Sequence, residues 1–542
     1  MVRVLKTQSV QSIGYILIWS DKRSCHASQT CINTEYVEFC SWLEASFLWS
    51  GEMLEENKKK QSIIKKIDYI LIAFQIIIAV ALGVKLFTMG VVPIIYLILY
   101  TIIILILNIG TFFSTKKSIP AIIFAIISVL ITIGLLYGLI AIGKLDMTLN
   151  NVAKDSRLEV VQMSVFVSSD DNANELRDIE GASVGYLESD NAADQVMSVI
   201  DGTVATEVQY KAYNNILFMA DALLNGTERA IIMNSAYVDI ISDQDGYEDF
   251  SDRIRELYTY SAEIQVEVRG DVTDVDSTEE KYFLSSDEDT FVIYISGIDM
   301  WGAVNARSRS DVNILAIVNM KTGHIQLVNT PRDYYVYLPN QGANDKLTHA
   351  GLYGVESSEA AIENLYGINI DYYVRMNFSG FEAIIDTLGG IDVYSEYDFT
   401  VDPIKHYTVG YNHVSGLEAL AFARERHAFA AGDVQRGINQ MEVIKAVINK
   451  MTSPSILAKY GEILDEVADC VMTDIPSNVI YDLVKYKLSN DVTWTIDSYT
   501  VTGTGKHTTT YSMPGTTCYV MIPNDQDVEN AKSLIESVLD EE

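Results

Sequence analysis

The sequence is poor in basic residues and lacks the signature motifs of several enzyme classes. It has 39 Lys and Arg residues against 73 Asp and Glu residues, a formal net charge of −34. No basic helix suited to reading DNA precedes the first apolar run, so nucleic acid is not an expected partner. A Gly-rich phosphate loop and a nucleophilic-serine turn are both missing, which argues against P-loop nucleotide hydrolases and serine hydrolases. His349, His406, His413 and His427 are not spaced with Cys or Glu as zinc ligands, so a zinc enzyme is not expected.

Three long apolar runs lie in the first third of the chain, at 67–87, 89–113 and 119–143. Each is close to or above the ~20 residues that span a bilayer as a helix, although the first contains Asp68, Gln75 and Lys85. Lysines cluster before the first run and between the second and third, whereas the turn at 88–90 is uncharged. The positive-inside rule therefore predicts a three-pass cell-membrane anchor with a cytoplasmic N-terminus and an extracytoplasmic C-terminal part.

The composition predicts five segments along the chain. Residues 1–52 hold three of the five cysteines and form either a cytoplasmic N-terminal extension or an over-extended start before Met53. The membrane anchor occupies 53–145, an accessory domain 155–268 and a catalytic domain 290–542, with the acidic stretch 271–289 as a solvated linker. Cys470 and Cys518 both lie outside the membrane, where they form a disulfide or stay as two buried thiols.

The accessory segment 155–268 alternates strand-like and helix-like patterns. Runs at 159–167 and 182–187 read as strands, and runs at 193–200 and 213–224 read as amphipathic helices, which together predict a small α/β domain. The order of elements from Met163 onward resembles the hinge-proximal part of extracellular solute-binding proteins. The alternative is a spacer or docking domain that binds no ligand.

The segment 290–542 is predicted to be an α/β domain with a mixed sheet covered by helices. Strands are expected at 291–295, 312–318, 324–329 and 371–376, with Gly323 allowing a hairpin turn between the second and third. A helix is expected at 380–388, closed by Gly389 and Gly390. Ser415 and Glu418 form a capping box that opens a further helix.

Arginines gather at the end of that further helix. Arg424, Arg426 and Arg436 surround Asp433, although the chain as a whole is strongly acidic. Because guanidinium groups present planar forks of donors, such a cluster indicates a phosphate or pyrophosphate site. Residues two apart on a helix point about 200° apart. The helix must therefore end or distort near Arg424 for Arg424 and Arg426 to reach one ligand; otherwise one of the two is a surface salt-bridge partner.

Several short motifs in a fixed order resemble a known family. They are GID at 297–299, RSD at 309–311, PRD at 331–333, DKLTHA at 345–350, NFSGFEAIIDTLGGIDV at 377–393, the arginine pair and the segment 433–440. In this order they resemble the LytR–CpsA–Psr catalytic domain. The resemblance implies a Mg²⁺-dependent, extracytoplasmic phosphotransferase. Such an enzyme moves a glycopolymer, teichoic acid or capsular polysaccharide, from a polyprenyl-pyrophosphate carrier to peptidoglycan.

The resemblance also assigns roles to residues. It implies Asp299 and Asp311 as Mg²⁺ ligands, a role that suits hard carboxylate oxygens. It implies Asp433 as the base for the acceptor hydroxyl, or as a residue that orients Arg424 or Arg426. The implied pyrophosphate-binding residues are Arg309, Arg332, Lys346, Arg424, Arg426, Arg436 and Gln440.

The chain departs from the family pattern at one position. Asn439 stands where many family members have a further arginine, so pyrophosphate affinity or acceptor choice is expected to differ.

The lipid chain of the carrier needs an apolar lining. The apolar positions of 360–366 and 378–388 either line a tunnel for the lipid or form ordinary core.

Two rival functions stay open. A polyprenyl-pyrophosphate hydrolase would use the same metal and arginines with water as acceptor. A membrane-bound receptor or regulator would instead bind a solute through 155–268.

Overall fold

The computed structural model describes residues 66, 69–90, 92–114, 118–152, 156–188, 190, 192–267, 290–298, 304–453, 463, 470–490 and 494–541. The predicted segments 1–52 and 271–289 and the predicted metal ligand Asp299 lie outside these residues. The chain divides into two compact units, Met1–Ile77 with Ile104–Ile133, and Ile78–Ile103 with Gly134–Glu542.

Apolar helices near the N-terminus indicate a membrane anchor. Among the described residues, Tyr69–Met89 and Ile126–Lys144 are long and apolar enough to cross a membrane, the latter within α4 (Ser118–Val152). The apolar part of α3 (Ile94–Ser114), Ile94–Gly110, is shorter, so the predicted count of three spans is not confirmed.

Polar residues in the first apolar run have polar partners within their own compact unit. Gln75 accepts a hydrogen bond of 2.5 Å from Ser128 in the first unit. In the second unit, Lys85 forms an ion pair with Asp146. Such pairing makes polar groups tolerable in an apolar helix.

The small lobe, residues 156–267, contains a five-stranded sheet in the order β3-β2-β4-β1-β5. Strand β2 runs parallel to β3 and β4, whereas β1 runs antiparallel to β4 and β5. The strands are β1 (Ser156–Ser168), β2 (Ser183–Leu187), β3 (Gln209–Tyr213), β4 (Ala230–Asn234) and β5 (Ile254–Glu267). The helices are η1 (Leu176–Ile179), α5 (Ala193–Thr203), α6 (Ile216–Leu224), α7 (Tyr237–Ser242) and α8 (Phe250–Arg253).

Most predicted elements of the small lobe are confirmed, but the helix expected at 213–224 begins later. Tyr213 ends strand β3, and α6 begins at Ile216. The reason is the N-cap: the Asn215 side chain accepts hydrogen bonds from the backbone N–H groups of Leu217 and Phe218.

The large lobe, residues 290–541, contains a six-stranded mixed sheet in the order β16-β11-β6-β7-β8-β17. Strands β6, β7 and β8 are antiparallel neighbours, β11 is parallel to β6, and β17 is parallel to β8. The strands are β6 (Thr290–Ile298), β7 (Ser310–Asn319), β8 (His324–Asn329), β11 (Tyr372–Met376), β16 (Val471–Thr473) and β17 (Thr495–Thr500). The predicted mixed sheet and the hairpin turn at Gly323 are therefore confirmed.

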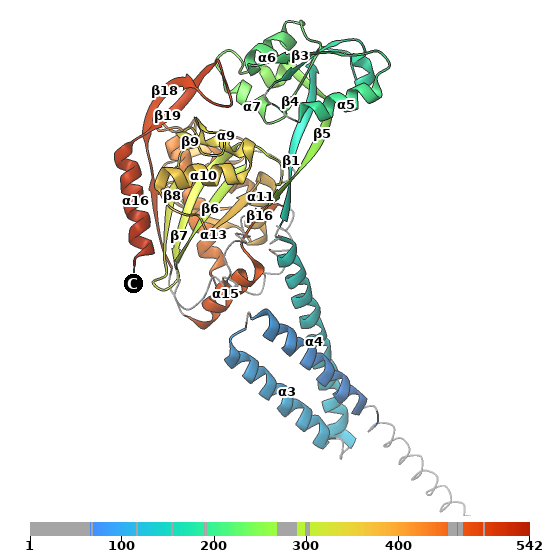
Figure 1. Cartoon of the computed structure of the whole chain (residues 1–542). Helices are drawn as coiled ribbons and strands as arrows, with labels where there is room; N and C mark the ends of the chain where they lie inside the picture. The colour runs from blue at the N-terminus through green and yellow to red at the C-terminus, as the bar shows by residue number, and fades with distance from the viewer. Residues whose placement is uncertain are drawn as a thin grey trace, which may run out of the picture. The chain divides into compact units, whose positions relative to one another are not determined.

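Helices cover both faces of this sheet (Figure 1). Alternate strand residues point to opposite faces, so Leu315 packs with α10 and α16, while Ala316 packs with α13 and α15. The helices are α9 (Leu347–Ala350), α10 (Val355–Tyr366), α11 (Phe378–Thr387), α12 (Gly416–Arg424), α13 (Asp433–Met451), α15 (Ser477–Ser489) and α16 (Asp525–Leu539).

The described part of the large lobe also holds four two-stranded antiparallel sheets. They are β9 (Tyr335–Leu338) with β10 (Ala343–Lys346), β12 (Ile391–Ser395) with β15 (Gly410–Val414), β13 (Phe399–Val401) with β14 (Lys405–Tyr407), and β18 (Gly503–Thr509) with β19 (Thr517–Pro523). No disulfide joins Cys470 and Cys518; Cys518 is buried and Cys470 is partly buried.

The two lobes share a hydrophobic core and backbone hydrogen bonds. Val160 of β1 donates to the Asn305 carbonyl at 2.9 Å, and Arg307 donates back to the Val160 carbonyl at 2.8 Å. Apolar side chains from α6, α7 and β4 pack with Leu352 and Val520 of the large lobe. The small lobe is thus packed against the large lobe rather than tethered to it.

Candidate functional site

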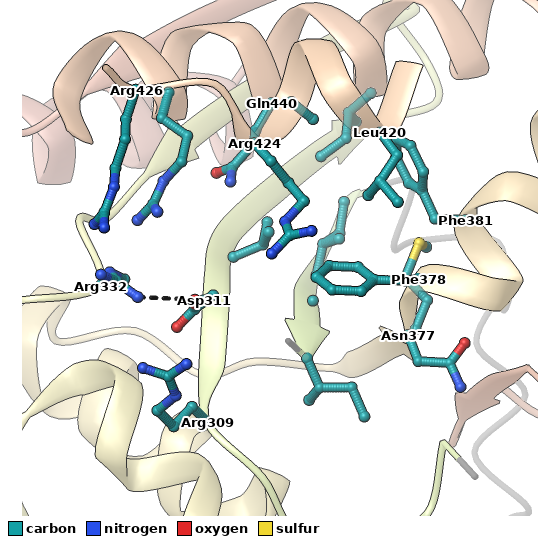
Figure 2. A pocket seen from close by; sticks show the side chains of 18 of the residues that line it. Arg309, Asp311, Arg332, Asn377, Phe378, Phe381, Leu420, Arg424, Arg426 and Gln440 are labelled. Atoms are coloured by element: carbon teal, nitrogen blue, oxygen red, sulfur yellow. Dashed lines mark hydrogen bonds and ion pairs between the residues drawn. The ribbon is translucent and has the colours of Figure 1, made fainter. Parts of the chain in front are cut away.

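A cavity of about 330 Å³ opens beside the six-stranded sheet, where β6, β7, β11, α11, α12 and α13 meet. Its lining is divided by chemistry, with cationic residues at one end and apolar residues at the other (Figure 2). The lining residues of the cationic end are Arg309, Arg332, Arg424, Arg426 and Arg436, and His427 also lines the cavity. The larger apolar ones are Ile295, Ile298, Val312, Met376, Phe378, Phe381, Leu420 and Ile444.

Two helix ends bring the arginines together. Helix α12 begins with the predicted capping box and ends at Arg424, because the next residue has an extended backbone with ψ of 128°. The prediction that the helix must end near Arg424 is confirmed, and both Arg424 and Arg426 line the cavity. Helix α13 then presents Arg436 and Gln440, four residues apart and so on one face, to the same cavity.

A close approach between α13 and β8 fixes this arrangement. A Cβ at Gly437 would overlap the side chain of Asn329 at the end of β8. The missing Cβ at Gly437 lets the helix lie this near the side chain of Asn329.

Asp311 is the central carboxylate of the cavity. It accepts hydrogen bonds from Arg332 at 2.9 Å and from the Thr348 hydroxyl at 2.8 Å. Burial raises the pKa of Asp311, but Arg332, Arg309 and Arg436 lower it more, so the pKa lies far below its usual range. Asp311 is therefore a carboxylate, the form that a hard metal ion requires.

Asp433 lies behind the arginines and is not among the described lining residues. Its oxygens lie 3.5 Å from Arg436 Nη2, 3.8 Å from Arg426 Nη1 and 3.7 Å from Arg332 Nε. These contacts favour an orienting role over a direct role as base. Asp433 was expected to orient Arg424 or Arg426. Its contacts are with Arg426, and also with Arg332 and Arg436.

Two further predicted positions, Lys346 and Asn439, bond to other protein groups. The Lys346 ammonium pairs with Asp333 at 3.1 Å, and Lys346 is not among the described lining residues. Asn439 is buried, accepts from Gln435 and donates to the Phe422 carbonyl at 3.2 Å. The departure from the family pattern at Asn439 thus lies inside the helix packing in this chain.

Helices α11, α12 and α13 supply part of the apolar end of the cavity, and strands β6, β7 and β11 supply the rest. Phe378 and Phe381 of the predicted 378–388 segment line it, together with Leu420. The other predicted segment, 360–366, contributes Ile362 and Tyr366 to the core between α10 and the sheet. One of the two candidate linings is therefore in the cavity, and the other is ordinary core.

The small lobe also reaches the cavity, which the sequence did not predict. Asp243 lines it, and Arg309 donates from Nη1 to Asp243 at 2.8 Å and from Nη2 to Asp239 at 3.2 Å. Burial lowers the pKa of Arg309, but Asp311, Asp239 and Asp243 raise it above its usual value. His427 is a second lining residue that was missed. No local sequence signal marks Asp243, because only tertiary packing brings it here, whereas His427 directly follows Arg426 in the arginine-rich segment.

Of the two predicted Mg²⁺ ligands, only Asp311 lies among the described residues. Among the described residues no three His, Cys, Asp or Glu side chains group as a metal site. Asp311, ionised and lining the cavity, fits the usual Mg²⁺ pattern of one or two carboxylates completed by phosphate oxygens and water.

The fold and the cavity define an α/β protein whose pocket is lined by arginines at one end and by apolar side chains at the other. Residues 255–532 match the LytR_cpsA_psr family, and the chain belongs to this family.

Curated relatives include two proteins named polyisoprenyl-teichoic acid–peptidoglycan teichoic acid transferase TagU. The one from Bacillus cereus is 36% identical over 194 residues, which is 36% of this chain and 63% of that protein. The one from Halalkalibacterium halodurans is 33% identical over 216 residues, 40% of this chain and 70% of that protein. The chain thus spans less than two thirds of the first of these relatives.

Solved structures of B. subtilis TagV and of TagT bound to LI-WTA are also similar. The first is 28% identical with a TM-score of 0.40, covering 47% of this chain and 98% of that chain. The second is 27% identical with a TM-score of 0.37, covering 46% and 91%.

Proposed function

We propose that this chain is a membrane-anchored phosphotransferase that moves a glycopolymer from a polyprenyl-pyrophosphate carrier to peptidoglycan at the outer face of the membrane. The observation that carries the proposal is the divided cavity, with five arginines at one end and aromatic and aliphatic side chains at the other. A pyrophosphate joined to a lipid has the same division of charge. Family membership and the names of the TagU relatives support a transferase of this kind.

The arginines are proposed to bind the pyrophosphate and to offset charge in the transition state. Arg309, Arg332, Arg424, Arg426 and Arg436 present their donors to one cavity, so a single diphosphate can contact several of them. Gln440 lies beside them, and Asp433 holds three of them in place. Lys346 is proposed to act on the pyrophosphate site indirectly, through its ion pair with Asp333.

Asp311 and Asp299 are the proposed Mg²⁺ ligands. A bound Mg²⁺ would neutralise negative charge on the phosphate oxygens. The acceptor hydroxyl oxygen bonds to the phosphorus that carries the glycopolymer, and that phosphorus loses its bond to the bridging oxygen. Polyprenyl phosphate leaves, and the hydroxyl proton passes to a carboxylate of the site or to water.

The proposed topology has three membrane crossings, with the N-terminus in the cytoplasm and both lobes outside. The lysine distribution supports this orientation. The proposed polymer is teichoic acid or capsular polysaccharide, and the names of the relatives favour teichoic acid. The resemblance of the small lobe to solute-binding proteins stays a prediction.

The experiment that tests this function uses the purified full chain with Mg²⁺ and a polyprenyl-pyrophosphate glycan, with and without a peptidoglycan fragment. Mass spectrometry should detect a phosphodiester-linked adduct only when the fragment is present. An Arg332→Ala variant serves as the control and should form no adduct. Polyprenyl phosphate released without adduct would mean a hydrolase, and tight lipid binding without turnover would mean a receptor.

A further inference from the structure

Two carboxylates of the small lobe face the arginines of the cavity. Asp239 lies on α7, and Asp243 caps its C-terminal end. Both terminal nitrogens of Arg309 donate to them, at 2.8 Å to Asp243 and 3.2 Å to Asp239. Asp243 Oδ2 also lies 4.0 Å from Arg332 Nη2. One carboxylate oxygen therefore stands between two guanidinium groups, as a phosphate oxygen would.

The packing of the lobes holds α7 at this place. Glu159 of the small lobe accepts from Arg307 Nε at 2.6 Å, and Asn215 donates to the Thr516 hydroxyl at 2.7 Å. Tyr237 and Ile241 of α7 belong to the core that both lobes share. The carboxylates are thus presented by a fixed element, and their contact with the cavity is part of the fold.

The exposed fractions of the side chains indicate that the carboxylates, and not Arg309, can move out of this contact. The Arg309 side chain is 7% exposed, whereas those of Asp239 and Asp243 are 55% and 40% exposed. The arginine is committed to the cavity, while each carboxylate can rotate into solvent. An incoming anion can therefore take the place of the carboxylates on Arg309.

We propose that Asp239 and Asp243 determine specificity by occupying the anion-binding side of Arg309 and Arg332, so that free phosphate and pyrophosphate bind poorly. A ligand with a lipid chain gains contacts with the apolar end of the cavity, and these contacts offset the displacement of the carboxylates. A small anion has no such contacts. The carboxylates thus compete with every anion for Arg309 and Arg332. Only a ligand with a lipid chain gains enough contacts elsewhere to displace them. The inference rests on the proposed function, since it needs the cavity to bind pyrophosphate.

The test measures binding of inorganic pyrophosphate to the purified full chain in detergent, by calorimetry without Mg²⁺. The double variant Asp239→Asn/Asp243→Asn should lower the Kd about tenfold, equivalent to 1.4 kcal/mol. Asp245→Asn is the matched control, because Asp245 is exposed, follows α7 and is not among the described lining residues. It removes one charge, as the single variant Asp243→Asn does, and should leave the Kd within about twofold.

A second ligand makes the selection itself visible. In the double variant, the Kd of a short polyprenyl pyrophosphate should change less than the Kd of inorganic pyrophosphate. The Kd of inorganic pyrophosphate divided by the Kd of the lipid should therefore fall. The single variant Asp243→Asn, which alters one exposed side chain, should show the same direction. Its thermal unfolding midpoint should match that of Asp245→Asn.

The outcomes separate the inference from the proposed function. An unchanged or raised Kd for pyrophosphate in the two aspartate variants would overturn the inference and make the carboxylates positioning groups for Arg309. Arg332→Ala and Arg436→Ala should each weaken pyrophosphate binding whatever the aspartates do. If both arginine variants bound pyrophosphate as tightly as the unaltered chain, the cavity would not be the proposed phosphate site.

Discussion

The guanidinium of Arg424 lies over the ring of Phe378, 4.4 Å from its centre. This contact joins the two halves of the cavity, because Arg424 belongs to the cationic end and Phe378 to the apolar end (Figure 2). The ring face attracts the cation and holds it at the border, where the first phosphate and the first isoprene unit of a lipid carrier would meet. The border is therefore set by one aromatic residue.

Phe378→Leu should weaken binding of polyprenyl pyrophosphate roughly 3- to 30-fold, since a cation–π contact is worth about 0.5–2 kcal/mol. Leucine keeps an apolar side chain but lacks the ring face that holds Arg424. Titration with a fluorescent polyprenyl pyrophosphate would measure the change. Phe218→Leu is the control, because Phe218 is 62% exposed on the small lobe. Equal affinity in both variants would show that the ring does not place the arginine.

Asp311→Asn should reduce glycopolymer transfer at least ~100-fold, the usual order of loss when one preorganised group at the developing charge is removed. The variant should also lose its response to Mg²⁺ concentration. Asparagine keeps the shape of the side chain but has one acceptor oxygen, so it can accept from Arg332 or from Thr348 but not from both. The chain should still fold. Asp392→Asn, an exposed acid on β12, is the control. Normal turnover with a normal Mg²⁺ response would remove Asp311 from the metal site.

Much of the large lobe could be predicted because its signals are local. Strand β8 was expected at 324–329 and occupies His324–Asn329, since alternation and the glycine turn before it act within a few residues. The arginine cluster stood out against an acidic chain, and its geometry required the helix end at Arg424.

The parts that sequence did not give depend on distant contacts. Asp243 and Arg309 are 66 positions apart and belong to different lobes, so no spacing rule joins them. Lys346 was predicted as a phosphate ligand, and its ammonium is paired with the buried Asp333, a partner that the sequence did not indicate. The helix begins at Ile216 because the Asn215 side chain caps it by accepting from the backbone N–H groups of Leu217 and Phe218.

Asp345 should make stability depend on acid pH. It is fully buried and accepts from His349 Nδ1 and from the Ser512 backbone N–H, each at 2.7 Å. Burial raises the pKa of Asp345, but His349 and Ser512 lower it more, so the pKa lies below its usual value. A depressed pKa gives stability that is fully present above the unfolded value of about 3.9 and is lost as pH falls below it.

Asp345→Asn should therefore lower the free energy of unfolding at pH 7 by about 3 kcal/mol, since hydrogen bonds to a buried charge are worth ~1.5–3 kcal/mol each. Its stability should also fall less steeply below pH 4 than that of the unaltered chain. Denaturant titrations at pH 7, 5 and 3.5 would measure both effects. Asp245→Asn should follow the unaltered curve, and parallel curves for Asp345→Asn would contradict the assignment.

Glu159 should be the most sensitive residue at the junction of the lobes. It is fully buried, with Oε2 at 2.6 Å from Arg307 Nε and Oε1 at 3.8 Å from Arg375 Nη1, and Arg375 is itself buried. Glu159→Gln should destabilise the chain by about 3–5 kcal/mol, because breaking a buried ion pair leaves a buried charge. Amide hydrogen exchange at Val160 and Arg307, whose N–H groups bond across the junction, should quicken.

The control for this prediction is Glu263→Gln, an exposed residue on β5 that lies opposite Val160 in the small sheet. It should cost less than ~1 kcal/mol, as surface substitutions do. Adding Arg375→Met to Glu159→Gln should recover part of the loss, since the unpaired charge is then removed. If Glu159→Gln cost no more than Glu263→Gln, the buried ion pair would not hold the lobes together, and the shared hydrophobic core and the other hydrogen bonds between the lobes would have to do so.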